Sequence, residues 1–221
     1  MMLMERIDHK RNFLKAGALL LAAVIFTFLV KIVNVQPIGP EGTWVGFAAI
    51  NVTIKNLLPL NMTWFKITDY LGYVLVLLSG IYAAAGVIQF FKTKSLRRVD
   101  MGLLVLYGLF AAAVIMYILF KFVAINYRPV LIDGELEASF PSSHMVLALC
   151  ASIGIAIFNK AKFGEKTKHL NMVILAIGIL VVLGRILSGV HWFTDIVGGA
   201  LYASAFIAFY NAARKKLVTL W

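Results

Sequence analysis

The sequence predicts an all-α, polytopic membrane protein with six transmembrane helices, organised as a single domain over residues 1–221. Composition gives the first indication, because 62% of the 221 residues are hydrophobic and only 14% are charged, and the mean hydropathy is +0.90. A water-soluble domain carries about 25% charged residues. The chain therefore lacks the polar surface that folding in water requires, and we expect it in a lipid bilayer.

The second indication is a set of six apolar runs. A helix that spans a membrane needs roughly 20 mostly apolar residues. Such runs occur at residues 13–33, 68–91, 101–122, 144–159, 170–188 and 194–212. The first run is longer than the roughly 7- to 15-residue apolar region of a cleaved signal peptide, and no small-x-small cleavage pattern follows it. We interpret it as a retained first helix.

A seventh, shorter apolar segment lies between the first two runs. Residues 43–58 are apolar with scattered polar positions, and a helix of that length would extend only about 24 Å. We expect a short interfacial or re-entrant helix on the exterior side. It either flanks a lateral entrance for a lipid tail or caps the helical bundle, and the sequence favours neither alternative.

The distribution of positive charge gives the third indication. The formal net charge is +11, and fifteen of the 21 Lys and Arg residues lie before or at the start of the first run, after the last, or in the second or fourth of the five connections between runs. Short basic loops are retained in the cytoplasm, so both termini are expected there. The basic segments then face anionic membrane lipids, and no nucleic-acid partner is expected. Cys150 is the only cysteine, which excludes an internal disulfide and a cysteine-based metal site.

Unusual polar residues gather on the opposite, extracytoplasmic side. They are Lys121 and Arg128 around the end of the third run, Ser142, Ser143 and His144 around the start of the fourth, Arg185 near the end of the fifth, and His191 and Asp195 around the start of the sixth. These residues come from separate helical hairpins, and chain connectivity alone does not require them to share one face.

Each spacing predicts a local geometry. Lys121 and Arg128 are seven residues apart and would point the same way on a continuous helix. Pro141 suits the first turn of a helix, and free backbone N–H groups of the following Ser142, Ser143 and His144 would form an anion site. His191 and Asp195 are four residues apart, so a helical turn would bring the carboxylate to the imidazole.

Taken singly, these residues have structural explanations. Lys and Arg near helix ends often extend toward lipid headgroups, and a histidine at a helix mouth is commonly interfacial. His191 and Asp195 could form a structural pair worth about 0.2 to 0.5 kcal/mol. Asp133, Glu135 and Glu137 are interpreted as part of a solvated loop. Taken together, two histidines and a carboxylate among the cations are not explained by contacts with headgroups.

The combined pattern resembles the three-part signature of the type 2 phosphatidic acid phosphatase superfamily of membrane lipid phosphatases. Lys121 is followed by six residues and Arg128-Pro129, then by Pro141-Ser142-Ser143-His144, and finally by Arg185, five residues, His191, three residues and Asp195. The resemblance covers roughly residues 65–212. Two positions depart from the family pattern, because Ser143 replaces a usual glycine and Gly184 replaces a usual Ser or Ala.

The resemblance implies roles for these residues. His191 would attack phosphorus and form a phosphohistidine, with Asp195 fixing its tautomer, and His144 would act as general acid and then general base. Phosphate-binding roles fall to Lys121, Arg128, Ser142, Ser143 and Arg185. Three fixed cations would take the place of a metal ion, so no metal and no cofactor are expected.

The resulting functional prediction is a metal-independent phosphatase of the cell inner (plasma) membrane, with its active site extracytoplasmic. Its substrate would be a lipid phosphate or diphosphate: undecaprenyl diphosphate, phosphatidylglycerol phosphate or phosphatidic acid, with a preference for the first. A lipid phosphotransferase shares the same intermediate. A membrane transporter or a non-catalytic lipid-binding protein on the same frame are the alternatives from other classes.

Overall fold

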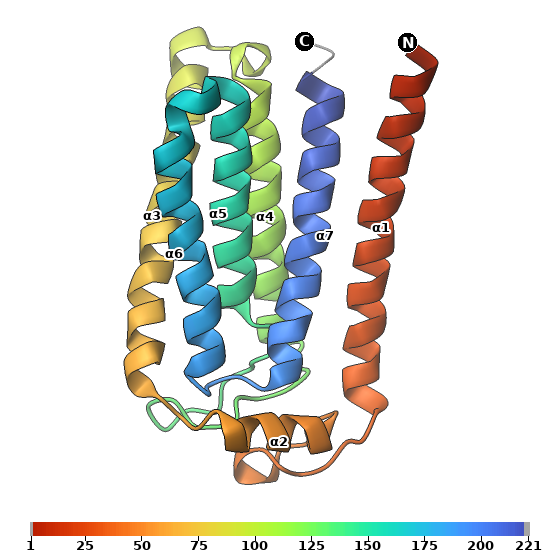
Figure 1. Ribbon diagram of the computed structural model, residues 1–221, viewed down its shortest axis with the longest axis vertical. Coiled ribbons are helices and arrows are strands. Elements are labelled where there is room, and N and C mark those ends of the chain that lie inside the picture. The colour runs from red at the N-terminus through yellow and green to blue at the C-terminus, as the bar shows by residue number, and fades with distance from the viewer. Residues whose placement is uncertain (1, 219–221) are drawn as a thin grey trace.

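Helices account for nearly all regular structure in the computed structural model, which describes residues 2–218 (Figure 1). The helices are α1 (Met2–Ile32), α2 (Ala48–Leu57), α3 (Met62–Thr93), α4 (Met101–Phe122), α5 (Ser143–Phe163), α6 (Lys168–Leu187) and α7 (Phe193–Val218). No strand occurs among the described residues, and three isolated β-bridges lie in loops. The predicted all-α class is confirmed.

Five helical runs within residues 2–218 are long and apolar enough to cross a membrane. One of them, Ser143–Leu187, has 45 residues and consists of α5, the turn η3 (Gly164–Thr167) and α6. Figure 1 shows α5 and α6 running back along each other from this turn. Each predicted apolar run lies in one helix to within one residue.

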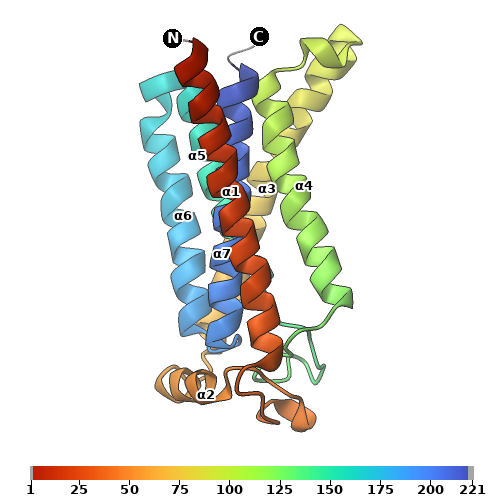
Figure 2. The ribbon, with the colours of Figure 1, turned by 90° about the vertical axis from the view of Figure 1, so that its right-hand side faces the viewer.

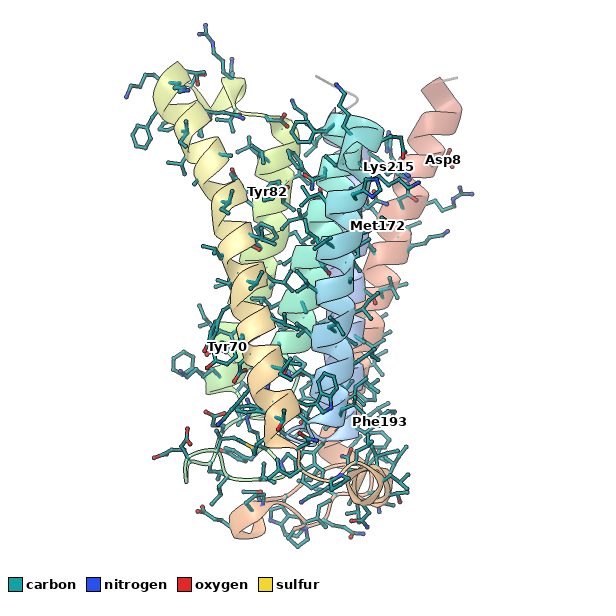
Figure 3. The ribbon with its side chains drawn as sticks, turned by 60° about the vertical axis from the view of Figure 1, so that its left-hand side comes forward. Asp8, Tyr70, Tyr82, Met172, Phe193 and Lys215 are labelled. Carbon is teal, nitrogen blue, oxygen red and sulfur yellow. The ribbon has the colours of Figure 1, made fainter. Side chains whose placement is uncertain are left out.

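Apolar side chains cover the outer surface of the bundle (Figure 3). Only 17% to 44% of the residues in the most apolar windows are buried inside the structure. Large apolar side chains such as Leu77, Ile115 and Ile179 are more than half exposed. An apolar surface of this extent is stable against lipid tails and unstable against water, which agrees with a multi-pass membrane protein.

The centre of the bundle is α5, which packs against α3, α4, α6 and α7, while α1 packs along α7. Small residues of α5, such as Ala148 and Gly154, are buried and allow its neighbours to approach closely. The buried Asn159 accepts a hydrogen bond from Tyr82 of α3 at 2.6 Å and donates one to Asn171 of α6 at 2.9 Å. This polar link fixes three helices relative to one another.

The two ends of the bundle differ in charge. Both described chain ends lie at one end together with the turns η2 (Leu96–Arg98) and η3 (Figures 1 and 2). That end carries the fifteen Lys and Arg residues near the termini and in these two connections. The opposite end holds α2 and the loops 123–142 and 188–192, where the unusual polar residues lie.

Helix α2 lies across this second end (Figure 1) and is shorter than the predicted segment 43–58. Its buried Asn51 donates to the hydroxyl of Thr194 at 3.0 Å and accepts from the backbone N–H of Thr194 at 3.2 Å. Because Thr194 lies in the first turn of α7, these bonds attach α2 to the start of that helix. The contact is the one expected of a cap over the bundle.

Candidate active site

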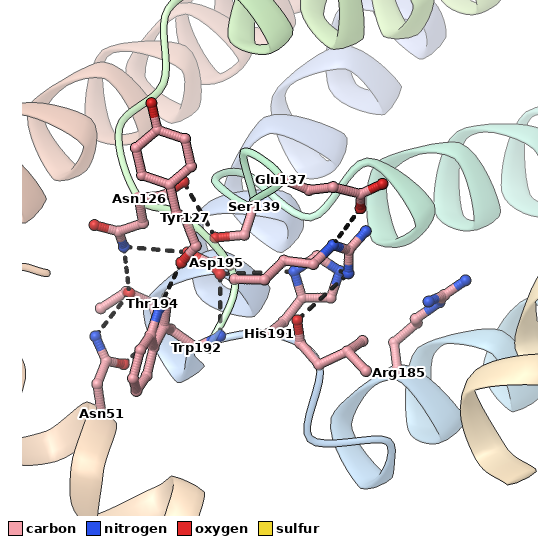
Figure 4. A network of polar contacts seen from close by, with 12 residues as sticks. Asn51, Asn126, Tyr127, Glu137, Ser139, Arg185, His191, Trp192, Thr194 and Asp195 are labelled. Atoms are coloured by element: carbon pink, nitrogen blue, oxygen red, sulfur yellow. Dashed lines mark hydrogen bonds and ion pairs between the residues drawn. The ribbon is translucent and has the colours of Figure 1, made fainter. Parts of the chain in front are cut away.

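Three segments meet between α2 and the helical bundle: the loop 123–142, the start of α5, and the loop 188–192 that leads into α7. The backbone N–H of Ser142 donates to the carbonyl of Asp195 at 3.0 Å and so ties α5 to α7. Within the first loop, Arg128 N–H donates to the Glu137 carbonyl and Ser139 N–H to the Asn126 carbonyl, both at 2.9 Å. These bonds fold the loop into a narrow hairpin against the site (Figure 4).

His191 is held between a carboxylate and a guanidinium (Figure 4). Its side chain is 2% exposed, with Nδ1 3.6 Å from Asp195 Oδ2 and Nε2 3.3 Å from Arg128 Nη1. Arginine can only donate, so Nε2 is the acceptor in this pair. The hydrogen-bond network therefore assigns the ring proton to Nδ1, facing the carboxylate, and leaves a lone pair on Nε2.

The pKa of His191 is lowered well below its ordinary value. Burial of the imidazole is the largest cause, and the positive charges of Arg128 and Arg185 lower the pKa further. Both effects disfavour the charged form. His191 is therefore neutral near physiological pH, the state in which Nε2 can act as a nucleophile.

Asp195 is fixed by the start of α7. It is the third residue of that helix, and its Oδ2 accepts the backbone N–H of Trp192 at 3.0 Å, a reach back to the residue before the helix that satisfies one free N–H group. Its Oδ1 accepts from Asn126 Nδ2 at 3.2 Å. Asn126 is a site residue that the sequence analysis missed, because nothing local links it to a carboxylate 69 positions away.

Arg128 lies in the loop and not on the helix that carries Lys121. Helix α4 ends at Phe122, so the continuous helix on which these two cations would point the same way does not form. The backbone beyond Phe122 bonds to residues 135–139 in place of continuing the helix. Arg128 is 8% exposed and donates through Nε to Glu137 at 2.7 Å. Glu137 is exposed on the loop, as predicted, and is also an ion-pair partner of Arg128.

Lys121 is the predicted residue that the structure does not join to the others. It lies in the last turn of α4 and is exposed. No hydrogen bond or ion pair connects it to the described site residues. Its phosphate-binding role stays a prediction.

The start of α5 differs from the prediction in two respects. The helix begins at Ser143 with Ser142 as N-cap, so Pro141 precedes the cap and does not lie in the first turn. The Ser142 N–H is bonded to Asp195 and is not free; Ser143 and His144 supply first-turn N–H groups with no partner inside the helix. Ser143 is helical and is absent from the positive-φ residues within 2–218, so replacing a glycine causes no backbone strain.

Arg185 and His144 share one carboxylate, Asp69 of α3. Arg185 is fully buried and pairs through Nη2 with Asp69, while its guanidinium lies 4.9 Å from the ring centroid of Phe65. His144 Nε2 lies 3.1 Å from the same Asp69 oxygen. The sequence analysis missed Asp69, although a lone carboxylate near the start of an apolar run indicates a functional residue.

Several buried polar atoms at the site have no hydrogen-bond partner within the described residues. They are Ser142 Oγ, His144 Nδ1, and Nε and Nη1 of Arg185, with His191 Nδ1 at the ion-pair distance from Asp195 given above. Buried polar groups are normally bonded. A set made almost entirely of donors suits a bound oxyanion. Residues 2–218 contain no group of three or more His, Cys, Asp or Glu side chains placed to hold a metal ion.

The part of the chain that carries these residues matches a known family. The family model of the PAP2 superfamily matches residues 101–218, a range that contains every predicted site residue. The chain belongs to the PAP2 superfamily. Members of this family are membrane phosphatases that act on phosphate esters of lipids, and the chain is a lipid phosphatase of this type.

Individual PAP2 relatives come from Bacillus. The chain is 31% identical over 185 residues to the bacitracin transport permease protein BcrC of Bacillus licheniformis, covering 78% of this chain and 81% of the relative. It is 38% identical over 68 residues to phosphatidylglycerophosphatase B of Bacillus subtilis (strain 168), covering 29% and 34%. The crystal structure of a transmembrane PAP2-type phosphatidylglycerolphosphate phosphatase from Bacillus subtilis shares the fold, with a TM-score of 0.57 at 21% identity over 90% of this chain and 94% of that one.

A cavity joins the PAP2 site to the membrane-facing surface. Its volume is about 410 Å³, and its lining includes Ser143 and His144 of α5, Tyr73 and Val76 of α3, and Tyr117 of α4. The cavity therefore opens between α3 and α4, and no residue of α2 lines it. Ile54 and Lys55 of α2 line a separate, smaller cavity that also includes His191, so the two roles expected for the short helix, cap and flank of an entrance, both stay predictions.

Proposed function

We propose that this protein is an integral membrane phosphatase that hydrolyses a lipid phosphate or diphosphate through a phosphohistidine intermediate. The observation that carries the proposal is the set of buried, unpaired donors on Ser142, His144 and Arg185 beside a neutral His191. Donors that are fixed before the substrate binds stabilise the charge of a phosphoryl group in the transition state.

In the first step, the Nε2 lone pair of His191 attacks phosphorus, and the bond from phosphorus to the leaving oxygen breaks. His144 donates a proton to that oxygen. Asp195, whose Oδ2 lies 3.6 Å from Nδ1 of His191, stabilises the positive charge that develops on the ring. Arg128 releases Nε2 and binds a phosphoryl oxygen together with Arg185.

In the second step, water hydrolyses the phosphohistidine. His144 takes a proton from the water as its oxygen bonds to phosphorus, and the bond to Nε2 breaks. Inorganic phosphate leaves, and His191 returns to its neutral form. Lys121, Ser142 and Ser143 complete the proposed phosphate-binding set.

A lipid substrate is supported by the cavity between α3 and α4. It is lined mainly by apolar and aromatic side chains, and His144 lies in its wall. A lipid tail in this cavity would put the leaving oxygen beside the proposed acid. Among undecaprenyl diphosphate, phosphatidylglycerol phosphate and phosphatidic acid we favour the first, because an extracytoplasmic site faces the side where that carrier is released. The name of the phosphatidylglycerophosphatase relative supports the second.

The proposed topology has six membrane spans, with α5 and α6 counted separately at 21 and 20 residues. Both termini would be cytoplasmic, α2 interfacial, and the active site extracytoplasmic in the inner (plasma) membrane. The charge difference between the two ends supports this orientation, since the end with the termini carries the excess of Lys and Arg.

Transport is the second candidate, because a relative that aligns with 78% of this chain is named a transport permease. A transport pathway needs polar groups along the depth of the bundle. The ionisable residues of the site are confined to one end, which favours phosphatase chemistry. A transferase that passes the phosphoryl group to another lipid would share the intermediate, and its product would be a new phospholipid in place of free phosphate.

The test is release of inorganic phosphate from a panel of lipid phosphates by the purified protein in detergent. We expect His191→Ala to reduce release to background while the protein remains folded, and to abolish labelling from a substrate with radioactive phosphorus. His169→Ala, which removes an exposed histidine at the opposite end of α6, is the matched control and should retain full activity. Wild-type phosphate release by His191→Ala would refute the proposal.

A further inference from the structure

Asp69 lies outside all three sequence motifs and outside the matched range 101–218, yet it contacts two residues of the site. It is the eighth residue of α3. Its carboxylate pairs with the guanidinium of Arg185 and lies 3.1 Å from Nε2 of His144. Contacts to two predicted site residues from separate motifs are not expected of an ordinary structural carboxylate.

The surrounding helix is shaped to bring this carboxylate to Arg185. Phe65, one turn before Asp69 on the same face, lies under the guanidinium at 4.9 Å. A Cβ atom on Gly184 would lie 2.3 Å from Cγ2 of Thr68, so α3 reaches this position only because glycine precedes Arg185. The departure from the family pattern at residue 184 thus coincides with the presence of an acidic partner on α3.

Asp69 contacts only one nitrogen atom of each of its two partners. It contacts Nη2 of Arg185 and Nε2 of His144. The remaining ring nitrogen, His144 Nδ1, and the Nε and Nη1 atoms of Arg185 are buried and have no partner among the described residues. A carboxylate that mimicked a bound phosphate would contact these unpartnered nitrogen atoms. Asp69 leaves them available, so the contact orients the two side chains and does not block the site.

We propose that Asp69 is a positioning residue for the leaving-group step, an inference that rests on the proposed function. By accepting the Nε2–H of His144, Asp69 assigns proton transfer to Nδ1, the nitrogen that has no other partner. Nδ1–H gives its proton to the leaving oxygen as the phosphorus–oxygen bond breaks. Nδ1 then takes a proton from the water that attacks the phosphohistidine, while Nε2 keeps its proton throughout. Each histidine of the site would thus use one ring nitrogen for a carboxylate and the other for the reaction.

The experiment compares two substrates that share a diacylglycerol tail and differ in their leaving group. When phosphatidic acid reacts, the leaving group is the alkoxide of diacylglycerol, which needs a proton. When the terminal phosphorus of diacylglycerol diphosphate reacts, the leaving group is the phosphate of phosphatidic acid, which needs a proton far less. We expect Asp69→Asn to lower kcat on phosphatidic acid by about 10- to 100-fold, part of the roughly 10²- to 10⁴-fold that a positioned acid contributes. The loss of kcat on the diphosphate should be much smaller, with KM little changed for both substrates.

A second arm shows whether Asp69 acts through His144. In a His144→Asn background the additional effect of Asp69→Asn should vanish, since the two changes remove the same step. The matched control is Asp100→Asn, which removes a carboxylate paired with Lys162 at the opposite end of the bundle and should leave both activities unchanged. If Asp69→Asn does not purify as a folded protein, Asp69→Glu, which keeps the charge and displaces it by one methylene, undergoes the same comparison.

The outcomes separate the inference from the proposed function. If the wild type releases phosphate from neither lipid, and from neither undecaprenyl diphosphate nor phosphatidylglycerol phosphate, the proposed substrate class fails. If the wild type is active but the Asp69 variant slows both substrates equally, raises only KM, or adds its full effect to His144→Asn, then Asp69 serves only Arg185 or stability. Any of those three results overturns the inference.

Discussion

Replacing Gly184 by alanine should loosen the attachment of α3 to the active site. A Cβ atom at residue 184 would lie 2.3 Å from Cγ2 of Thr68 and 3.0 Å from Cε3 of Trp64. Real Cβ atoms essentially never come closer than 3.0 Å to such atoms. Thr68, the neighbour of Asp69, must therefore shift by at least 0.7 Å, the difference between 2.3 and 3.0 Å, and we expect this shift to move Asp69 away from Arg185.

The expected loss of stability is small compared with the loss of activity. Overpacking of this kind costs about 1 to 3 kcal/mol, and the better helix propensity of alanine offsets up to about 1 kcal/mol. A displacement of about 1 Å at catalytic groups can lower the rate by about 10²-fold. We therefore expect a modestly lower melting temperature and a loss of kcat on phosphatidic acid that approaches the loss for Asp69→Asn.

The assay combines thermal unfolding in detergent with phosphate release, and two further variants act as controls. Gly80→Ala changes a glycine of α3 whose added Cβ would meet no atom within 4 Å, so activity should be unchanged. Thr68→Ser removes the clashing Cγ2 and keeps the hydroxyl that donates to the Trp64 carbonyl at 2.8 Å. Combined with Gly184→Ala, it should recover most of the lost activity. The reasoning is refuted if Gly184→Ala behaves like Gly80→Ala, or if Thr68→Ser gives no recovery.

Three further predictions concern the reaction and its location. The acid limb of kcat/KM should lie below pH 6.5, the ordinary pKa of histidine, because the lowered pKa of His191 keeps the nucleophile neutral to lower pH. Ionisation of the substrate is measured by phosphorus NMR and corrected for. An acid limb that still lies at or above pH 6.5 contradicts this prediction. Phosphate release should persist in EDTA and be inhibited by vanadate, a mimic of the five-coordinate transition state, whereas loss in EDTA with recovery on adding magnesium contradicts the mechanism. An impermeant maleimide should label Asp133→Cys in intact cells and Lys166→Cys only after permeabilisation, with little background from the buried Cys150; the reverse pattern would invert the topology.

The helices could be predicted from the sequence because one physical requirement sets them. A hydrocarbon layer of about 30 Å demands about 20 apolar residues per crossing. Runs such as 101–122, which α4 matches at both ends, satisfy that requirement locally. The candidate site residues were predicted for a related reason: His191 and Asp195 are ionisable groups near the ends of apolar segments, where charge is costly unless it has a function.

The geometry of the site could not be predicted, because non-local bonds determine it. The end of α4 at Phe122 depends on backbone bonds from residues 126 and 128 to residues 137–139. The backbone N–H of Ser142 is not free at the start of α5 because it is bonded to Asp195, 53 residues further along the chain. Asp69 is separated from Arg185 by 116 positions. Spacing rules for a helix reach only three or four residues, so none of these contacts lies within their range.

The site also divides between two parts of the chain according to the step that each serves. The residues proposed to hold the phosphoryl group, Arg128, Arg185 and His191 among them, all lie within 101–218, the range shared with the superfamily. The side that faces the leaving group is different. Asp69 contacts His144 from α3, and the cavity beside His144 takes Gly72, Tyr73 and Val76 of its lining from the same helix. The proposed phosphoryl chemistry thus lies in the shared range, whereas α3 adds contacts on the side of the departing lipid to those from α4 and α5. Exchange of α3 residues between relatives should therefore change the preferred lipid while the phosphohistidine step remains intact.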